Sequence, residues 1–181
     1  MRFAFDIRLT DEDYLNYNIF WMLRSPYGKK EIVKFRLLFT AVLGILCFLF
    51  LLSGGFSKES LLGVVPYLIA FLLVQALTNA IFTWSLKRQI KSLKKKGKMG
   101  YSPTSEMVFF EDSFTETTPD KRIEEKYTSI ERISILSDKV IYIHVNNVMS
   151  YIVPMSCFSS REEGDAFLGF LKEKCQNIDT Y

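Results

Sequence analysis

The sequence predicts a membrane α+β protein: a transmembrane hairpin of two helices, and a cytoplasmic antiparallel β-sheet closed by one C-terminal helix. Three observations predict this class. Two apolar spans, residues 35–53 and 62–86, are separated by a short polar link. Positive residues flank the hairpin on its outer sides. After residue 105 the hydrophobic period changes from that of a helix to the alternation typical of strands.

Each apolar stretch is long enough to cross a bilayer. Residues 35–53 carry one charge, Arg36, at their start, where a long side chain can reach the headgroups. A helix of this length covers about 28 Å, close to the ~30 Å hydrocarbon thickness. Residues 62–86 contain no Asp, Glu, Lys, Arg or His. A buried hairpin of a soluble protein would carry a polar stripe, and a signal peptide would not follow a long patterned segment.

The flanking charges set the expected orientation. Four cations, Arg24, Lys29, Lys30 and Lys34, precede the first span, and Arg36 lies at its start. Seven follow the second span, whereas the link at residues 53–60 carries only Lys58. Cytoplasmic segments retain positive residues, so both termini are expected in the cytoplasm of a cell-membrane protein. Residues 1–104 carry 15 Lys and Arg against 6 Asp and Glu, a net charge of +9. Residues 105–181 carry 8 against 14, a net charge of −6. An acidic domain is therefore tethered by a basic segment that faces anionic lipid.

These boundaries divide the chain into four segments. Residues 1–34 form an N-terminal strand and an amphipathic helix, and residues 35–86 form the transmembrane hairpin. Residues 87–104 form a basic juxtamembrane helix and linker, and residues 105–181 form the cytoplasmic β domain with its C-terminal helix.

Residues 2–9 predict a half-buried strand, because apolar and polar side chains alternate strictly. Phe3, Phe5 and Ile7 share one face. A single strand is not stable in water. Since the predicted orientation puts both ends of the chain on one side, we expect this strand to join the C-terminal sheet.

A helix is predicted over residues 11–23. Thr10 can cap it, and the acids of its first turn suit the helix dipole. Its aromatic residues recur at helical spacing and leave two placements open: at the level of the headgroups, or packed on the cytoplasmic domain or first span. Residues 25–28 predict a turn before the first span.

Polar residues inside the spans predict contacts between helices. Gln75, Asn79 and Thr83 are spaced by four and share one face of the second span. Away from water they need partners, either Thr40 of the same chain, with the close approach that Gly44 allows, or a neighbouring protomer of a homo-oligomer. A polar transport pathway is the alternative, but no carboxylate or base lies inside the spans to line one.

Residues 87–98 continue the second helix beyond the membrane and are strongly basic. Their cations are Lys87, Arg88, Lys91, Lys94, Lys95, Lys96 and Lys98. We expect this segment to contact membrane lipid. It either recognises anionic headgroups, each charge contributing about 1 kcal/mol near a charged surface, or is a simple stop-transfer anchor. Nucleic acid is not expected as a partner, because no aromatic residue is interleaved.

Six short strands are predicted in the C-terminal domain. They span residues 106–110, 114–118, 123–127, 131–136, 139–145 and 148–153, with turns at 112–113, 119–120, 128–129, 137–138 and 146–147. Such short links favour antiparallel neighbours, and Pro154 ends the sheet. A capping box at Ser159 or Ser160 then begins a helix. Its apolar stripe is expected to cover the sheet with Ala166, Phe167, Phe170, Leu171 and Lys174 or Cys175.

Several local sequences resemble the YcxB-like family of small bacterial membrane proteins. They are the N-terminal strand followed by Thr10-Asp11-Glu12-Asp13-Tyr14, then Ser25-Pro26, Phe109-Phe110-Glu111-Asp112, Tyr127-Thr128-Ser129-Ile130 and Ile152-Val153-Pro154-Met155-Ser156-Cys157-Phe158. The resemblance covers nearly the whole chain. It implies a cytoplasmic domain with a pleckstrin-homology-like (PH-like) sheet and one C-terminal helix, and it implies no catalytic residue and no ligand.

No sequence motif indicates catalysis. The only histidine, His144, alternates with apolar residues on a predicted strand, where a structural histidine is expected. Cys47, Cys157 and Cys175 form neither a metal-ligand spacing nor a disulfide framework, which fits a reducing cytoplasm. We expect no catalytic, cofactor-binding or metal-binding residue.

Three functional classes remain, one of which, an immunity or self-protection role for a small two-span protein, nothing in the sequence tests. The first is a non-enzymatic membrane protein whose acidic domain binds a protein partner, through a sheet edge or the face beside the C-terminal helix. It rests on fold analogy and on the segregation of charge. The alternative is a lipid-sensing or transport-associated component, suggested by the basic segment and by Gln75 and Asn79.

Overall fold

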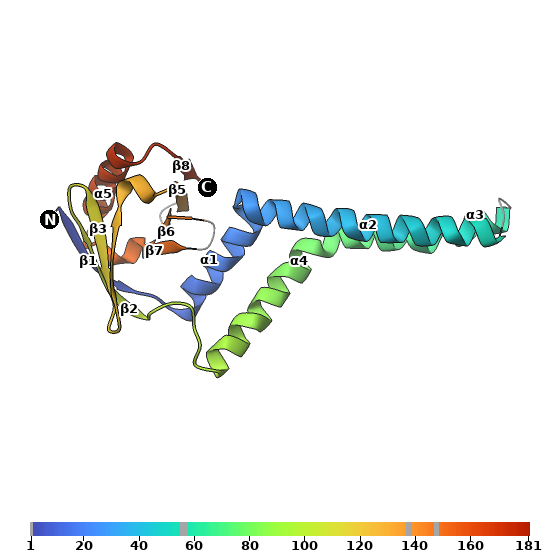
Figure 1. Ribbon diagram of the computed structural model, residues 1–181, viewed down its shortest axis with the longest axis horizontal. Coiled ribbons are helices and arrows are strands. Elements are labelled where there is room, and N and C mark those ends of the chain that lie inside the picture. The colour runs from blue at the N-terminus through green and yellow to red at the C-terminus, as the bar shows by residue number, and fades with distance from the viewer. Residues whose placement is uncertain (1, 55–57, 137–138, 147–148) are drawn as a thin grey trace. The chain divides into compact units, whose positions relative to one another are not determined.

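The computed structural model in Figure 1 describes residues 2–54, 58–136, 139–146 and 149–181. The chain divides into two compact units. The first joins Met1–Tyr17 to Gly97–Tyr181 and contains the described strands, and the second is Asn18–Lys96. The predicted α+β class is confirmed. The predicted link at 53–60, the turns at 137–138 and 146–147 and the start of the strand predicted from residue 148 lie partly or wholly outside the described residues.

The first unit contains two four-stranded sheets rather than the single sheet predicted. The first sheet has the antiparallel order β1 (Phe3–Arg8), β2 (Thr104–Phe109), β3 (Ser113–Thr117) and β4 (Arg122–Lys126). The second has the order β7 (Ser150–Pro154), β6 (Val140–His144), β5 (Arg132–Leu136) and β8 (Ile178–Thr180). The chain changes sheet at η1 (Tyr127–Ser129), a 3-10 turn whose Tyr127 side chain enters the core, so β5 follows β4 without pairing to it.

β8 was not predicted, because a strand of three residues shows no alternation of its own. It pairs with β5 in parallel, with Ile178 opposite Ile133 and Thr180 opposite Ile135. This pairing supplies partners for the backbone of the β5 edge that β6 leaves open.

β1 confirms that the N-terminal strand joins the sheet. Its register with β2 runs from Phe3 opposite Phe109 to Arg8 opposite Thr104. Phe5 and Ile7, the predicted apolar face, are 4% and 1% exposed. Segments that precede and follow the second unit are therefore held together by a ladder of backbone hydrogen bonds.

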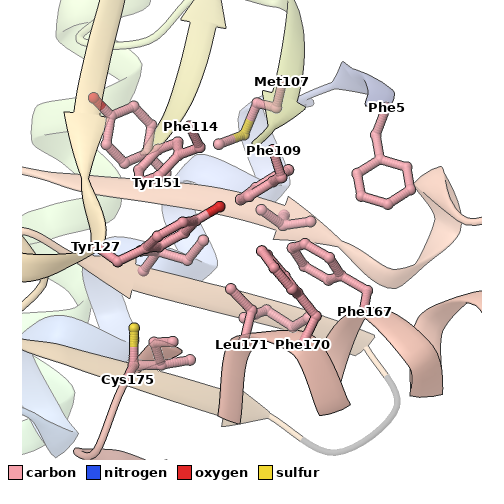
Figure 2. Close-up of a cluster of buried hydrophobic side chains, with 14 of the residues drawn as sticks. Phe5, Met107, Phe109, Phe114, Tyr127, Tyr151, Phe167, Phe170, Leu171 and Cys175 are labelled. Atoms are coloured by element: carbon pink, nitrogen blue, oxygen red, sulfur yellow. The ribbon is translucent and has the colours of Figure 1, made fainter. Parts of the chain in front are cut away.

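The core of the first unit lies between one face of each sheet and α5 (Arg161–Lys174). Figure 2 shows Phe167, Phe170 and Leu171 of α5 pointing toward aromatic side chains of the strands. The rings of Phe109 and Phe167 meet edge to face, with centroids 4.7 Å apart. Such contacts add about 0.5–1.5 kcal/mol beyond the burial of area.

α5 begins as predicted and differs from the prediction in its buried stripe. The Ser160 hydroxyl accepts a hydrogen bond from the Glu163 amide at 3.3 Å, and the Glu163 carboxylate accepts one from the Ser159 amide at 2.7 Å. Ala166 is exposed, contrary to the prediction, whereas Gly164 is buried. Gly164 allows a close approach, because an added methyl group would meet the side chain of Met155 at 3.1 Å.

α1 (Asp11–Arg24) and α2 (Pro26–Gly54) are separated by Ser25 alone, so the predicted turn at 25–28 is wrong in extent. The Ser25 hydroxyl accepts a hydrogen bond from the Gly28 amide at 2.9 Å, while Pro26 takes the first position of α2, where its missing N–H costs nothing. A methyl group at Gly28 would overlap the backbone carbonyl of Met22, so glycine is required at this corner.

The second unit consists mainly of α2 and α4 (Val65–Lys95), with the short α3 (Lys58–Gly63) between them. Both long helices are apolar enough to cross a membrane, and this supports membrane association. Their large apolar side chains are exposed, for example Leu38 at 67% and Leu72 at 64%. Figure 1 shows the C-terminal part of α4 turning away from α2. The hydroxyls of Thr78 and Thr83 donate to the carbonyls of Val74 and Asn79, a contact that often bends helices.

Replacing Phe5 with Ala should destabilise the first unit by about 3–5 kcal/mol, because the ring is buried against Phe109, Phe158 and Phe167. Urea unfolding of the full chain in mild detergent, followed by tyrosine fluorescence, measures the change. Ala4→Ser on the exposed face of the same strand is the control and should change stability by less than about 0.5 kcal/mol. Equal stability of Phe5→Ala and wild type would contradict the placement of β1 in the core.

Candidate functional site

Three places in the described residues bring polar groups together. One lies between α2 and α4, one lies where the N-terminus meets α5, and one lies on the face of the second sheet that is turned away from the core. The basic segment at the end of α4 is a fourth candidate, predicted from the sequence.

Between α2 and α4 the polar side chains predicted in the spans meet within one chain. Gln75 Nε2 donates a hydrogen bond to Thr40 Oγ1 at 3.3 Å. Arg36 Nη2 donates to the Gln75 carbonyl oxygen at 3.2 Å and to Asn79 Oδ1 at 3.4 Å. Thr83 donates to the carbonyl of Asn79 at 2.9 Å and does not reach across.

The structure adds one contact here and corrects one expectation. The guanidinium of Arg36, which was expected to reach for the headgroups, lies against α4, where neutral oxygens accept its N–H groups. Its spacing of four from Thr40 places both on one face of α2 and could have revealed it. A methyl group at Gly44 would meet no described atom within 4 Å, so Gly44 is not a point of close approach within the chain.

The seven cations predicted to face lipid are all exposed. Those up to Lys95 lie on α4, where Lys94 and Lys95 also complement the helix dipole, and Lys96 caps the helix. Gly97 follows with φ of +64°, a left-handed conformation that favours glycine. The Arg88 guanidinium lies 5.5 Å from the centre of the Trp84 ring. A tryptophan beside a cation is typical of the headgroup level of a membrane helix.

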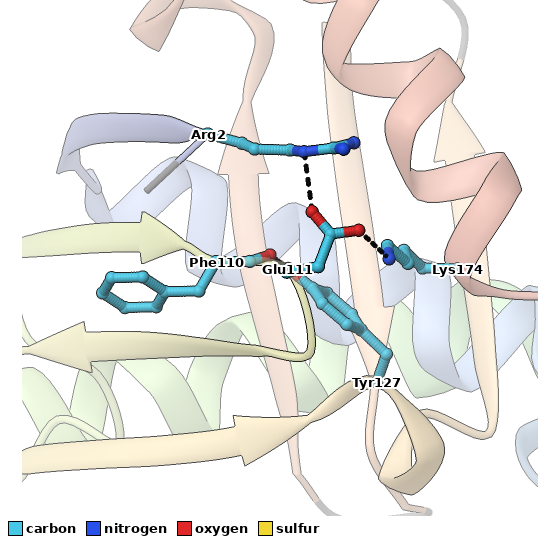
Figure 3. Close-up of polar contacts among 5 residues, drawn as sticks. All are labelled: Arg2, Phe110, Glu111, Tyr127 and Lys174. Atoms are coloured by element: carbon cyan, nitrogen blue, oxygen red, sulfur yellow. Dashed lines mark hydrogen bonds and ion pairs between the residues drawn. The ribbon is translucent and has the colours of Figure 1, made fainter.

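Glu111 joins the N-terminus to the end of α5, as Figure 3 shows. Its carboxylate lies 2.9 Å from Arg2 Nε and 2.8 Å from Lys174 Nζ. The hydrogen bond from Lys174, followed by the charge of Arg2, lowers the pKa of Glu111. Beside it the Tyr127 hydroxyl donates to the Phe110 carbonyl at 3.0 Å. These contacts fix the two basic side chains around an exposed carboxylate.

A depression of about 340 Å³ lies next to this ion pair and is open to solvent. It is lined by Arg2, Phe3, Ala166, Gly169, Phe170 and Glu173. The rings of Phe3 and Phe170 lie 5.4 Å apart, and nothing lies within 4 Å of a methyl group added at Gly169. An apolar floor with one cation and one anion at the rim suits the side chain of a binding partner.

The outer face of the second sheet is polar and buried. His144 Nδ1 lies 2.8 Å from Ser150 Oγ, and His144 Nε2 lies 3.0 Å from Ser134 Oγ. Burial, assisted by the charge of Arg132, lowers the pKa of His144 to about 4, although Asp179 acts in the opposite direction. A neutral imidazole donates through one nitrogen and accepts through the other, so it can bond both the buried Ser134 and the half-buried Ser150.

Tyr17 of α1 covers this face, with its ring 5.2 Å from Tyr142 and 6.5 Å from His144. Tyr14 stacks on Tyr101 at 4.9 Å, and Tyr101 donates a hydrogen bond to Asp11 at 2.7 Å. The helix was predicted either at the headgroups or packed on protein. The first half of α1 packs on the β domain. The described residues contain no group of three or more His, Cys, Asp and Glu side chains that could hold a metal ion.

The chain matches no protein-family model, no curated protein and no solved structure.

The titration of His144 gives a prediction about pH. Its pKa of about 4 in the folded chain lies below the ordinary value of about 6.5. Between these values the unfolded chain binds a proton that the folded chain does not, so the free energy of unfolding falls as the pH falls through this window, by about 3 kcal/mol in total. His144→Gln should lack this component.

Because His144 is the only histidine, its ring signals can be followed directly by NMR in detergent. We expect no change in their chemical shift from pH 8 to about pH 5. A midpoint near 6.5 would show that the ring is solvated and contradict its buried position.

Proposed function

We propose that this chain is a non-enzymatic integral membrane protein that presents a PH-like domain in the cytoplasm and binds a protein partner at the membrane. The pairing of β1 with β2 is the observation that carries the proposal. A sheet whose neighbouring strands precede and follow a membrane hairpin requires both ends of the hairpin on one side of the bilayer. An even number of spans meets that requirement.

The cytoplasmic side follows from the cations. Lys29, Lys30 and Lys34 precede the apolar part of α2, and the seven exposed cations follow the apolar part of α4. Cytoplasmic flanks retain such residues. Two sheets that are antiparallel except for the pairing of β8 with β5, and that α5 closes, support the PH-like assignment that the family resemblance implies.

The titratable groups support a binding role over catalysis. His144 is neutral near pH 7, and its nitrogens are engaged with serines. Burial raises the pKa of Cys157 to about 12, which leaves a thiol rather than the nucleophilic thiolate. The depression, in contrast, is open to solvent, and its lining combines the apolar Phe3, Ala166 and Phe170 with the charged Arg2 and Glu173. It lies beside α5, where a partner was expected.

A lipid-sensing role is the second candidate, and the exposed cations of α4 beside Trp84 favour it. Both roles need the same insertion in the membrane. They differ in whether the first unit has a protein ligand.

A reporter fused after Tyr181 tests the orientation. Alkaline phosphatase, which needs an oxidising compartment, should be inactive there, and a fluorescent protein that folds in the cytoplasm should be bright. Alkaline phosphatase fused after Lys58 should be active. Activity of the phosphatase after Tyr181 would contradict the cytoplasmic location of the β domain.

Substitution at the depression tests the partner. Ala166→Arg should remove a protein that is reproducibly crosslinked to the full-length chain in native membranes, since a charged side chain would fill the apolar floor. Gln176→Arg adds the same charge at an exposed position outside the depression and should leave the crosslink unchanged. Deleting residues 105–181 is a poorer test, because it would also leave β1 unpaired.

Only self-contacts and lipid contacts in the wild-type crosslinks would contradict the protein-partner role. A crosslink that survives Ala166→Arg would place the partner elsewhere on the β domain.

A further inference from the structure

The guanidinium of Arg36 has no acidic partner at its place between α2 and α4. Both acceptors of Arg36 Nη2, the carbonyl oxygen of Gln75 and Oδ1 of Asn79, are neutral. The Nε atom of Arg36 is buried and finds no acceptor among the described residues. A buried or half-buried charge is costly unless an opposite charge or several hydrogen bonds compensate it.

The hairpin cannot supply that opposite charge. The sequence contains no Asp or Glu in residues 32–58 or 60–105. The nearest acid before Arg36 is Glu31, which accepts a hydrogen bond from Lys34 at 2.7 Å. The hairpin of a second copy has the same sequence, so dimerisation through the spans would add a second cation rather than an anion.

The depth of Arg36 indicates where an anion would come from. From Leu37 to Gly54, α2 provides about 27 Å of apolar helix, nearly the full hydrocarbon thickness of ~30 Å. Arg36 therefore lies where that thickness ends, at the level of lipid phosphates on the side of the basic flanks. Guanidinium groups bind phosphate through charge-assisted hydrogen bonds.

We propose that Arg36, held by Gln75 and Asn79 at the surface of α4, binds an anionic phosphate group, from a phospholipid headgroup or from free phosphate. The inference rests on the membrane insertion in the proposed function and not on the protein partner. It assigns binding to a fixed guanidinium inside the hairpin rather than to the exposed cations of residues 87–98. Arg36 is then a phosphate-binding residue as well as a contact between helices.

The full-length protein, reconstituted in mixed vesicles of phosphatidylcholine and phosphatidylglycerol and released in mild detergent, tests this by native mass spectrometry. Wild type should retain phosphatidylglycerol over phosphatidylcholine by about tenfold, the range expected for hydrogen bonds between charged groups. Arg36→Gln should lose the preference. Arg122→Gln removes the same charge from an exposed position on β4, outside the hairpin and its basic flanks, and should keep it.

The source of the phosphate is separated by adding inorganic phosphate to delipidated protein. A rise in melting temperature that Arg36→Gln abolishes would assign the site to the free anion, whereas a rise with phosphatidylglycerol alone assigns it to the lipid. Should Arg36→Gln not fold by circular dichroism, Arg36→Lys replaces it, since lysine keeps the charge without the planar fork and should lower the preference.

Several results would overturn the inference: equal retention of both lipids by wild type with no effect of inorganic phosphate, a preference that persists in folded Arg36→Gln, or an unchanged preference in Arg36→Lys. Recovery of wild type from the aqueous fraction of cells would instead refute the membrane insertion on which the proposed function depends. Insertion without lipid preference leaves that function standing.

Discussion

The pairing of β1 with β2 constrains the rest of the molecule. Residues 3–8 and 104–109 form one antiparallel ladder. The segment between them, residues 9–103, must therefore leave this ladder and return to it. That stretch contains two long helices with exposed apolar surfaces. If both cross a bilayer, as proposed, the compartment that holds β1 also holds β2. A single span would separate the strands and leave Phe5 and Ile7 without a core. In a membrane-spanning chain, pairing of β1 with β2 therefore requires an even number of spans.

Elements with a strong local pattern were predictable. The alternation of residues 2–9 gave β1, and the six strands after residue 105 were each placed within two residues of their observed ends where the structure describes them. Both predicted N-terminal caps formed because they depend on contacts between residues three or four apart: Thr10 with Asp13, and Ser160 with Glu163. Helix caps and the alternation of strands depend only on residues close together in the sequence.

The division into two sheets was not predictable, because it depends on contacts between residues far apart in the sequence. The local sequence of residues 127–129 fits either a hairpin turn or a change from one sheet to the other. The burial of Tyr127 in the core, which depends on distant residues, decides between them. β8 is too short to be recognised, and it forms only because β5 offers an unpaired edge. Likewise Gln75 and Asn79 were recognisable as a polar face, whereas the partner Arg36 belongs to another helix.

The ionisation of the buried groups bears on what the first unit can do. His144, Tyr142 and Cys157 are each shifted by burial toward the neutral form: the pKa of the histidine is lowered, and the pKa values of the phenol and the thiol are raised. A general base or nucleophile works with a pKa near the operating pH, and these shifts move all three away from it. Neutral groups bonded within the fold stabilise it without transferring protons. Arg2, Glu111 and Lys174, in contrast, are charged groups that pair with one another at the surface beside the depression. A partner of the kind proposed would meet these charges and not the neutral groups inside the domain.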